Sequence, residues 1–122
     1  MKGSEIMASK YKNVKTIVDG IKFDSKKEAQ RYADLRLAEI NGLISNLERQ
    51  VKFELVPAQY VEINGKRTLA ERKVTYIADF VYYDRETGRT VAEDVKGYRT
   101  EAYRIKRKLF RFKYPGIVFK EI

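Results

Sequence analysis

The 122-residue chain contains no histidine and no cysteine. Without histidine there is no imidazole general base, no Ser-His-Asp triad and no histidine-bound metal. Without cysteine there is no disulfide framework and no zinc-thiolate site. Any metal that this chain binds must therefore be a hard cation held by oxygen ligands, which means Mg²⁺, Mn²⁺ or Ca²⁺.

Long apolar runs are also missing, and there are only two prolines and no tryptophan. No segment has the length and apolarity of a membrane span, and the polar N-terminus has no stretch typical of a signal peptide. We therefore expect a soluble, cytoplasmic chain with no membrane contact. Residues 1–12 are polar, and we expect them to be loosely ordered, with residues 13–122 forming one domain.

Positive charge, in contrast, is abundant. The chain has 26 Lys and Arg residues against 17 Asp and Glu, which gives a formal net charge of +9. With 43% hydrophobic residues it has enough apolar side chains for a globular core. Such a charge balance favours a polyanionic partner, and nucleic acid is the first candidate.

Hydrophobic periodicity and turn residues predict an α/β (α+β) fold with a mixed central sheet, two flanking helices and the core order αβββαβ. The expected elements are a hairpin at 13–23, a helix from the Ser25 cap to about residue 40, a strand at 50–56, a hairpin around Asn64-Gly65, strands at 74–83 and 90–96, a helix at 101–113 capped by Thr100, and a strand at 117–122. Helical spacing predicts buried stripes at Ala29, Tyr32, Ala33, Leu37 and Ile40, and at Ala102, Ile105, Leu109 and Phe112.

The strand at 90–96 ends in a charged motif. Side chains alternate along a strand, so Asp94 and Lys96 share one face with Ala92. The same rule turns Glu93 to the opposite face, with the apolar residues Val91 and Val95.

Asp79 lies in the middle of the most apolar strand, where alternation places it with Ile77 and Val81. Burying an unpaired carboxylate costs roughly several kcal/mol, so we expect Asp79 to have a partner. The two strands should pair as a hairpin, which would bring Asp79, Asp94 and Lys96 together. One interpretation is a shared metal site; the alternative is a salt bridge from Lys96 to either acid.

Glu28 stands three residues after Ser25, at the start of the first helix. This is the spacing of a capping box, in which the acid satisfies a free backbone N–H group. From the same first turn the Glu28 side chain could also face the sheet, and the two roles do not exclude each other.

The last helix is strongly basic and carries one acid, Glu101. We expect its cations to contact phosphates; the alternative is a solvated charged face. The interleaved Tyr98, Tyr103 and Phe110 would either stack on bases or pack on the sheet. The expected nucleic-acid-binding residues are Arg99, Arg104, Lys106, Arg107, Lys108, Arg111 and Lys113.

Taken in order, several segments resemble the PD-(D/E)XK nuclease superfamily, and within it a phage-type family described as a domain of unknown function and compared with Holliday-junction resolvases. The resemblance spans about residues 10–122. It rests on Phe23-Asp24-Ser25-Lys26-Lys27-Glu28, Gly42-Leu43-Ile44, Leu47-Glu48-Arg49-Gln50, Phe53 and Leu55, Tyr76 with Ala78-Asp79-Phe80, Glu93-Asp94-Val95-Lys96-Gly97, and Tyr103 with Lys106.

This resemblance implies a restriction-endonuclease-like core and the catalytic roles. Asp79 matches the first acid, Asp94 the second, Lys96 the lysine, and Glu28 the glutamate that some members carry on the first helix. Ala78 stands where the superfamily motif has proline. The implied metal is Mg²⁺, with Mn²⁺ as a substitute, held by Asp79, Asp94, the backbone carbonyl of Val95 and Glu28.

The resemblance therefore implies an Mg²⁺-dependent endodeoxyribonuclease that cuts branched or duplex DNA in phage recombination, repair or replication, inside a bacterial host cell. A junction-cutting enzyme would be expected to form a homodimer, although no residue pattern marks a dimer face. Two rival hypotheses remain: a non-catalytic nucleic-acid-binding module that keeps the fold, and a small basic RNA-associated protein.

Overall fold

The computed structural model describes residues 16–95 and 98–122. The segment 1–12, which we expected to be loosely ordered, lies outside these residues, and so do the predicted site residue Lys96 and its neighbour Gly97. The described core consists of helices α2 (Lys26–Ile40) and α3 (Glu101–Lys113) and strands β3 (Ile44–Val56), β6 (Val74–Asp84), β7 (Arg89–Asp94) and β8 (Val118–Glu121).

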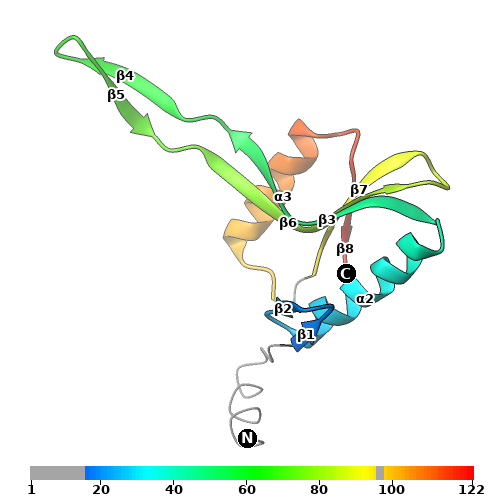
Figure 1. Ribbon diagram of the computed structural model, residues 1–122. Coiled ribbons are helices and arrows are strands. Elements are labelled where there is room, and N and C mark those ends of the chain that lie inside the picture. Colours follow the sequence, from blue (N-terminus) through cyan, green and yellow to red (C-terminus); the bar gives the residue numbers. More distant parts are fainter. Residues whose placement is uncertain (1–15, 96–97) are drawn as a thin grey trace, which may run out of the picture.

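The central sheet has the strand order β3-β6-β7-β8 (Figure 1). β3 with β6 and β6 with β7 are antiparallel, whereas β7 and β8 are parallel. A parallel pair needs a crossover connection, and α3 supplies it. The mixed sheet with two helices, and the predicted order of helices and strands, are confirmed.

Two small hairpins complete the chain: β1 (Thr16–Val18) with β2 (Ile21–Phe23), and β4 (Gln59–Ile63) with β5 (Lys66–Glu71). Both turns were expected from Asp19-Gly20 and Asn64-Gly65. All four of these residues have positive φ, as the type I′ hairpin turn requires. The β4–β5 hairpin projects from the end of the sheet as an arm (Figure 1).

β3 is longer than the predicted strand at 50–56. It begins at Ile44, which is buried, and it pairs with β6 as far as Asp84. A register shift lies between Ser45 and Glu48, and Asn46 has φ 56°. This bulge breaks the alternation of apolar and polar residues, which is why periodicity predicted a strand only from residue 50 onward.

Both helices begin at the predicted caps. The Ser25 hydroxyl accepts a hydrogen bond from the N–H of Glu28, and the Thr100 hydroxyl accepts one from the N–H of Tyr103, each at 3.1 Å. These side chains satisfy donors that the first helical turn leaves free. Within the described residues, neither helix is long and apolar enough to cross a membrane.

The two faces of the sheet carry separate apolar clusters, one beneath each helix. The α2 cluster contains Phe23, Ala29, Tyr32, Leu35, Ile44, Phe80, Tyr82 and Val91. The α3 cluster contains Leu55, Tyr76, Ala78, Ala92, Tyr103 and Phe110. The neighbours Val91 and Ala92 fall in different clusters, as expected for adjacent residues in a strand that is covered on both sides.

The predicted buried stripe of α2 is only partly right. Ala29 and Tyr32 are buried and Ala33 is half-buried, but Leu37 and Ile40 are exposed. The buried face is centred on Glu28, Tyr32 and Leu35, and Leu37 lies on the far side of the helix from it.

The predicted stripe of α3 is wrong in its orientation. Ala102 and Ile105 are exposed and the Phe112 side chain is 86% exposed, while Leu109 is half-buried. Tyr103 and Phe110 are buried instead. The Phe110 ring lies 4.9 to 5.4 Å from the rings of three aromatic residues on the sheet side, Phe53, Tyr76 and Phe119. Burying these larger rings sets how α3 is rotated.

β6 changes its buried face along its length. Tyr76 packs against Phe110 of α3, whereas Phe80 packs against Tyr32 of α2. In an unbroken strand, residues four apart lie on the same face. The change occurs around Asp79, so the prediction that Asp79 shares one continuous face with Ile77 and Val81 is wrong.

The cause of this change lies in the neighbouring strand. Gln50 of β3 is positioned opposite Asp79, between the pairs Arg49–Phe80 and Val51–Ala78, and it has φ 52°. A residue with a left-handed backbone conformation interrupts the alternation of a strand. The side chains after it then lie on the face opposite to the one that regular alternation predicts. The alternation of side chains is therefore interrupted at the same place in both strands, at Gln50 in β3 and at Asp79 in β6.

Candidate active site

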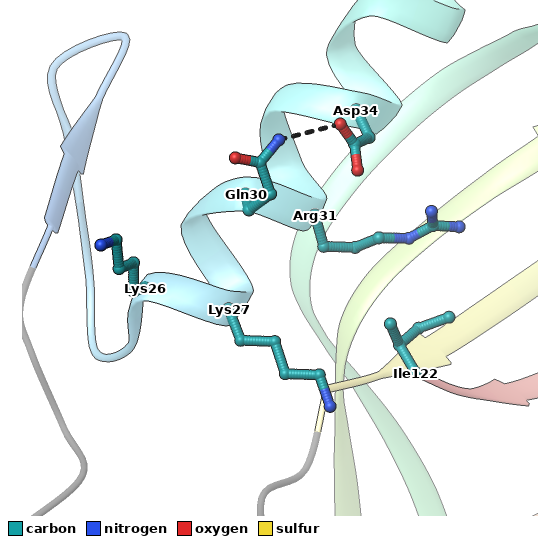
Figure 2. A pocket seen from close by; sticks show the side chains of 6 residues that line it. All are labelled: Lys26, Lys27, Gln30, Arg31, Asp34 and Ile122. Atoms are coloured by element: carbon teal, nitrogen blue, oxygen red, sulfur yellow. Dashed lines mark hydrogen bonds between the residues drawn. The ribbon is translucent and has the colours of Figure 1, made fainter.

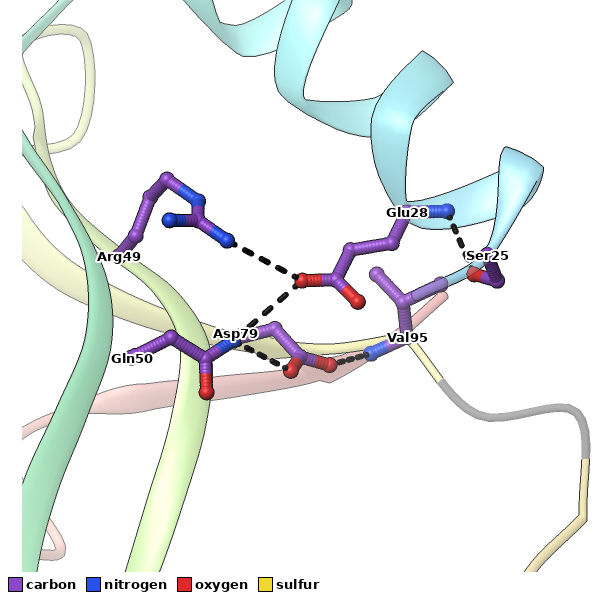
Figure 3. Close-up of polar contacts among 6 residues, drawn as sticks. All are labelled: Ser25, Glu28, Arg49, Gln50, Asp79 and Val95. Carbon is purple, nitrogen blue, oxygen red and sulfur yellow. Dashed lines mark hydrogen bonds and ion pairs between the residues drawn. The ribbon is translucent and has the colours of Figure 1, made fainter. Parts of the chain in front are cut away.

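Asp79 is half-buried at this break, and its carboxylate reaches the end of β7. Oδ2 of Asp79 accepts a hydrogen bond of 2.7 Å from the backbone N–H of Val95 (Figure 3). The β6–β7 hairpin thus brings Asp79 next to the residue that follows Asp94, as predicted. The N–H of Val95 is the group in contact with Asp79; the expected role of the Val95 carbonyl as a metal ligand stays a prediction.

The amide of Gln50 connects two acids from different elements. Its Nε2 atom lies 3.3 Å from Oδ1 of Asp79 and 3.3 Å from Oε2 of Glu28 (Figure 3). Both distances are at the long end for hydrogen bonds, so each contact is weak. Gln50 therefore marks the point at which carboxylates from α2 and β6 converge.

Of the two roles left open by the sequence for the Glu28 side chain, the orientation toward the sheet is observed, and the capping-box bond of its carboxylate stays a prediction. The backbone N–H of Glu28 is held by the Ser25 cap, while its side chain is turned toward the sheet and is almost fully buried. Nη2 of Arg49 lies 3.8 Å from Oε2 of Glu28, and the same guanidinium lies over the Phe23 ring at 4.5 Å. The cap fixes the first turn of α2, and that turn aims the carboxylate at Gln50.

Asp94 is fully buried at the end of β7, near two tyrosines. Burial, together with the negative charge of Asp94, raises the pKa of Tyr76 well above its ordinary value. Burial also raises the pKa of Tyr103, and hydrogen bonding to Glu121 and the charge of Asp94 add to that effect. Both hydroxyls are therefore protonated near neutral pH, and that of Tyr103 donates its proton to Oε2 of Glu121.

Glu93 points to the opposite face of the sheet, as alternation predicted. Its two carboxylate oxygens accept hydrogen bonds of 2.7 and 2.6 Å from Nε and Nη2 of Arg31, and Tyr82 donates a third. This bidentate ion pair attaches α2 to β7. The hydrogen bond from Arg31 also raises the pKa of that guanidinium. Glu93 thus has a structural role, which leaves Asp94 as the acid on the site side.

A pocket of about 300 Å³ lies beside the acids on the α3 side of the sheet. Tyr76 and Tyr103, the tyrosines affected by Asp94, form part of its wall. The threonines Thr75 and Thr100 and the ammonium of Lys106 contribute polar groups to its lining, which suits an anion such as phosphate. The lining residues are Thr75, Tyr76, Ile77, Thr100, Ala102, Tyr103 and Lys106.

Two of the seven predicted nucleic-acid-binding cations are paired with one acid, Glu121 of β8. Arg107 lies 2.8 Å and Arg99 3.2 Å from Oε2 of Glu121, and the Tyr103 hydroxyl donates to the same oxygen at 2.6 Å. Burial would raise the pKa of Glu121, but the bonds from Tyr103 and Arg107 outweigh it and lower the pKa to about 2. These contacts attach the start of α3 to the edge strand.

The other five cations differ in their surroundings. Lys106 lines the pocket on the α3 side of the sheet, and Arg104 and Lys108 are exposed on α3. Arg111 lies over the Phe119 ring at 5.5 Å and Lys113 over the Tyr114 ring at 5.7 Å. Arg104, Lys106 and Lys108 are therefore the members of the predicted set best placed to meet phosphates.

A second pocket, of about 480 Å³, lies along the first turns of α2 near the C-terminal residue Ile122 (Figure 2). Lys26 and Lys27 contribute positive charge to it, and Gln30 donates a hydrogen bond of 3.0 Å to Asp34 at its edge. Arg31 also lines this pocket but is bound to Glu93. The basic surface therefore extends to the helix that carries Glu28.

The acids fit an oxygen-bound divalent cation only in part. Within residues 16–95 and 98–122, no three acidic side chains lie close enough together to form a metal-binding group. Glu28 and Asp79 nevertheless converge on one neutral amide, with the amide nitrogen between them and the amide oxygen turned away (Figure 3). Mg²⁺ needs few protein ligands because it keeps several waters. The fit is therefore limited to two carboxylates, with water supplying the remaining ligands of an Mg²⁺ ion.

Gln50 and Arg49 are the site residues that sequence reasoning missed. Both belong to a segment that carries the nuclease resemblance, but strand alternation placed Gln50 on a face with Lys52 and Glu54. The positive φ of Gln50 breaks that alternation, and no residue type in the segment requires it. The Arg31–Glu93 ion pair was missed as well, because the two residues are distant in sequence.

The profile of the DUF1064 family, described as a protein of unknown function, matches residues 8–122. This chain belongs to the DUF1064 family. No curated protein and no solved structure shows a significant match to it. Every part of the site described above lies inside the matched DUF1064 region.

Proposed function

We propose that this DUF1064 chain is a metal-dependent endodeoxyribonuclease with the restriction-endonuclease-like core of the PD-(D/E)XK superfamily. One observation carries the proposal. The carboxylates of Glu28 and Asp79, from α2 and β6, meet at a single amide beside the end of the strand that carries Asp94. Two carboxylates that meet beside the end of this strand are consistent with the arrangement that the nuclease resemblance implies.

The electrostatic setting of Asp79 supports a cation at this point. Its two oxygens accept hydrogen bonds from the Val95 N–H and the Gln50 amide, which are both neutral donors. Glu93 on the opposite face shows how this chain holds a purely structural acid, with a bidentate arginine. Neutral donors leave the negative charge of Asp79 in place, whereas Arg49 partly offsets that of Glu28, and a divalent cation would offset the charge that remains.

Each residue then has a chemical task. A bound Mg²⁺ would polarise the phosphate and lower the pKa of a water molecule. Glu28 and Asp79 would hold the ion, with Asp94 beside them, and the Val95 N–H fixes the direction of the Asp79 carboxylate. The hydroxyls of Thr75 and Thr100 and the ammonium of Lys106 would receive the phosphate there.

Lys96 completes the proposed set, although it lies outside the described residues. The resemblance gives it the role of holding or deprotonating the attacking water and of offsetting charge on the phosphate. Branched DNA as the substrate, Mn²⁺ as an alternative metal and phage recombination, repair or replication as the setting rest on the same resemblance.

A second candidate function is a nucleic-acid-binding module without catalysis. The observation that favours it is the burial of Asp94, combined with the absence of a three-acid group within the described residues. In that case the basic face of α3 would bind DNA and the acids would serve only to shape the sheet. Binding would then need no divalent metal.

The experiment that separates these functions uses labelled duplex, single-stranded and four-way-junction DNA with Mg²⁺, Mn²⁺ or EDTA. The proposal predicts cleavage with metal, none with EDTA, and loss of cleavage with retained DNA binding in Asp94→Asn. Binding without cutting under every condition would reject the nuclease and support the binding module.

A further inference from the structure

The amide of Gln50 lies between two carboxylates from different elements. Its Nε2 atom is 3.3 Å from Oδ1 of Asp79 and 3.3 Å from Oε2 of Glu28, and its oxygen is turned away from both acids (Figure 3). An ionised carboxylate only accepts hydrogen bonds, whereas an amide has one end that donates and one that accepts. The acids therefore decide which end of the Gln50 amide faces them, and they select the nitrogen.

The two acids keep their positions without this amide. Oδ2 of Asp79 accepts a shorter hydrogen bond, of 2.7 Å, from the N–H of Val95. Glu28 belongs to the first turn of α2, which the Ser25 cap fixes. The contacts of Gln50 are both at the long end for hydrogen bonds, so each is weak and can be given up at little cost. The amide thus responds to acids that other contacts hold in place.

The backbone of Gln50 is held as well, by the pairs Arg49–Phe80 and Val51–Ala78 on either side of it. The terminal side-chain torsion of a glutamine, in contrast, is broad and roughly two-fold. A half turn about that bond exchanges the amide nitrogen and the amide oxygen, and it moves no backbone atom. Gln50 can therefore present either end of its amide to the acids from the same position in β3.

A divalent cation between Glu28 and Asp79 would reverse the preference of the amide. The NH2 group carries partial positive charge and would face an ion of the same sign, whereas the amide oxygen is a hard donor that Mg²⁺ and Ca²⁺ accept as a ligand. The half turn then replaces two weak hydrogen bonds by one neutral oxygen ligand. This oxygen would be a third protein donor beside the two carboxylates.

We propose that Gln50 is a metal-responsive residue, whose nitrogen bridges Glu28 and Asp79 without a cation and whose oxygen binds Mg²⁺ after a half turn of the amide. This inference rests on the proposed function, because it requires a metal between these two acids. It gives the site a ligand that neither the strand pattern nor the nuclease resemblance assigned. The ligands that the resemblance implies are Asp79, Asp94, Val95 and Glu28.

Nitrogen NMR of the side-chain amides tests the half turn. The chain has three glutamines, Gln30, Gln50 and Gln59, so ¹⁵N labelling of glutamine gives few side-chain signals to assign. On titration with Mg²⁺, without DNA, the Gln50 amide signals are expected to shift and to saturate together with the binding measured by calorimetry. Gln30, which donates a hydrogen bond of 3.0 Å to Asp34, is the internal control, and its signals should stay in place.

Metal affinity separates ligation by Gln50 from mere proximity to the ion. Gln50→Met keeps the length of the side chain but has no oxygen, and it is expected to raise the Kd for Mg²⁺ by about tenfold. Gln50→Glu keeps an oxygen and adds a negative charge, so it should bind Mg²⁺ more tightly than the wild-type chain. Gln30→Met is the matched control and should bind Mg²⁺ like wild type.

Two results would overturn the proposal and leave a two-carboxylate metal site standing. They are Mg²⁺ binding with unshifted Gln50 signals, and an unchanged Kd in Gln50→Met. A wild-type chain that binds no Mg²⁺ would reject this proposal together with the metal site of the proposed function. The NMR titration uses the wild-type chain, so it gives its result even if a variant fails to fold.

Discussion

Nε2 of Gln50 lies 3.3 Å from Oδ1 of Asp79, at the point where β6 changes its buried face. The two features belong together. The positive φ of Gln50 reverses the faces of β3, and the neighbouring strand follows, so that Asp79 turns toward Glu28 and Val95. Local backbone geometry at one residue thus assembles the candidate site.

Replacing Gln50 by methionine tests this assembly. Gln50→Met keeps the length of the side chain but removes the amide that Glu28 and Asp79 share. We expect the free energy of unfolding to fall by less than about 1 kcal/mol, because the acids lose a donor whose contacts are long and partly exposed to solvent. Urea unfolding should show the loss, and added Mg²⁺ should recover more stability in this variant than in Asp79→Asn. Equal recovery in both would contradict a metal site at this position.

The buried ion pair between Arg31 and Glu93 gives a stability prediction. In Arg31→Ala the fully buried Glu93 loses its only bidentate ion pair among the described residues and keeps the hydrogen bond from Tyr82. We expect a loss of about 3 to 5 kcal/mol, since breaking a buried pair leaves an uncompensated charge. Arg36→Ala, which breaks an exposed pair with Glu39, is the matched control and should cost less than about 1 kcal/mol. Thermal or urea unfolding of the two variants gives the comparison.

Glu121 predicts how stability depends on pH. Its folded pKa of about 2 lies below the ordinary value of 4.5, so its contribution is complete above pH 4.5 and is lost as the pH falls toward 2. The shift corresponds to less than about 3 kcal/mol after solvent screening. Glu121→Gln should flatten the acid limb of a plot of unfolding free energy against pH. Glu62→Gln, on the exposed arm, removes the same charge and should leave that limb unchanged.

The surroundings of the α3 cations predict two classes of DNA-binding variant. Arg104→Ala and Lys108→Ala remove exposed charges, so they should weaken DNA binding without altering stability. Each should also reduce the slope of log affinity against log salt by roughly one unit if it removes one phosphate contact. Arg107→Ala should instead destabilise the fold, because Arg107 binds Glu121. Fluorescence anisotropy at several salt concentrations, with parallel thermal melts, separates the classes.

Much of the fold could be predicted from local signals. The caps at Ser25 and Thr100 and the turn at Asn64-Gly65 lie where residue chemistry placed them. Alternation along β7 correctly separated Glu93 from Asp94, because that strand is regular.

The errors arise where tertiary contacts overrule a local pattern. Ile105 and Phe112 have helical spacing, but Tyr103 and Phe110 bury larger rings and set how α3 is rotated. The role of Gln50 depends on a left-handed backbone conformation that its residue type does not require. Tertiary packing set both the rotation of α3 and the conformation of Gln50. The periodicity of a single segment contains no information about contacts with other segments.

The measurement that tests the central claim most directly is cleavage of a labelled four-way junction in Mg²⁺ by three proteins: wild type, Asp79→Asn and Asp84→Asn. Asp79 and Asp84 lie on the same strand, β6, but Asp84 pairs with Arg89 at its far end, away from Gln50. The account predicts cleavage by wild type and Asp84→Asn, and none by Asp79→Asn with DNA binding retained. Equal activity in all three proteins, or no cleavage by any of them, would contradict it.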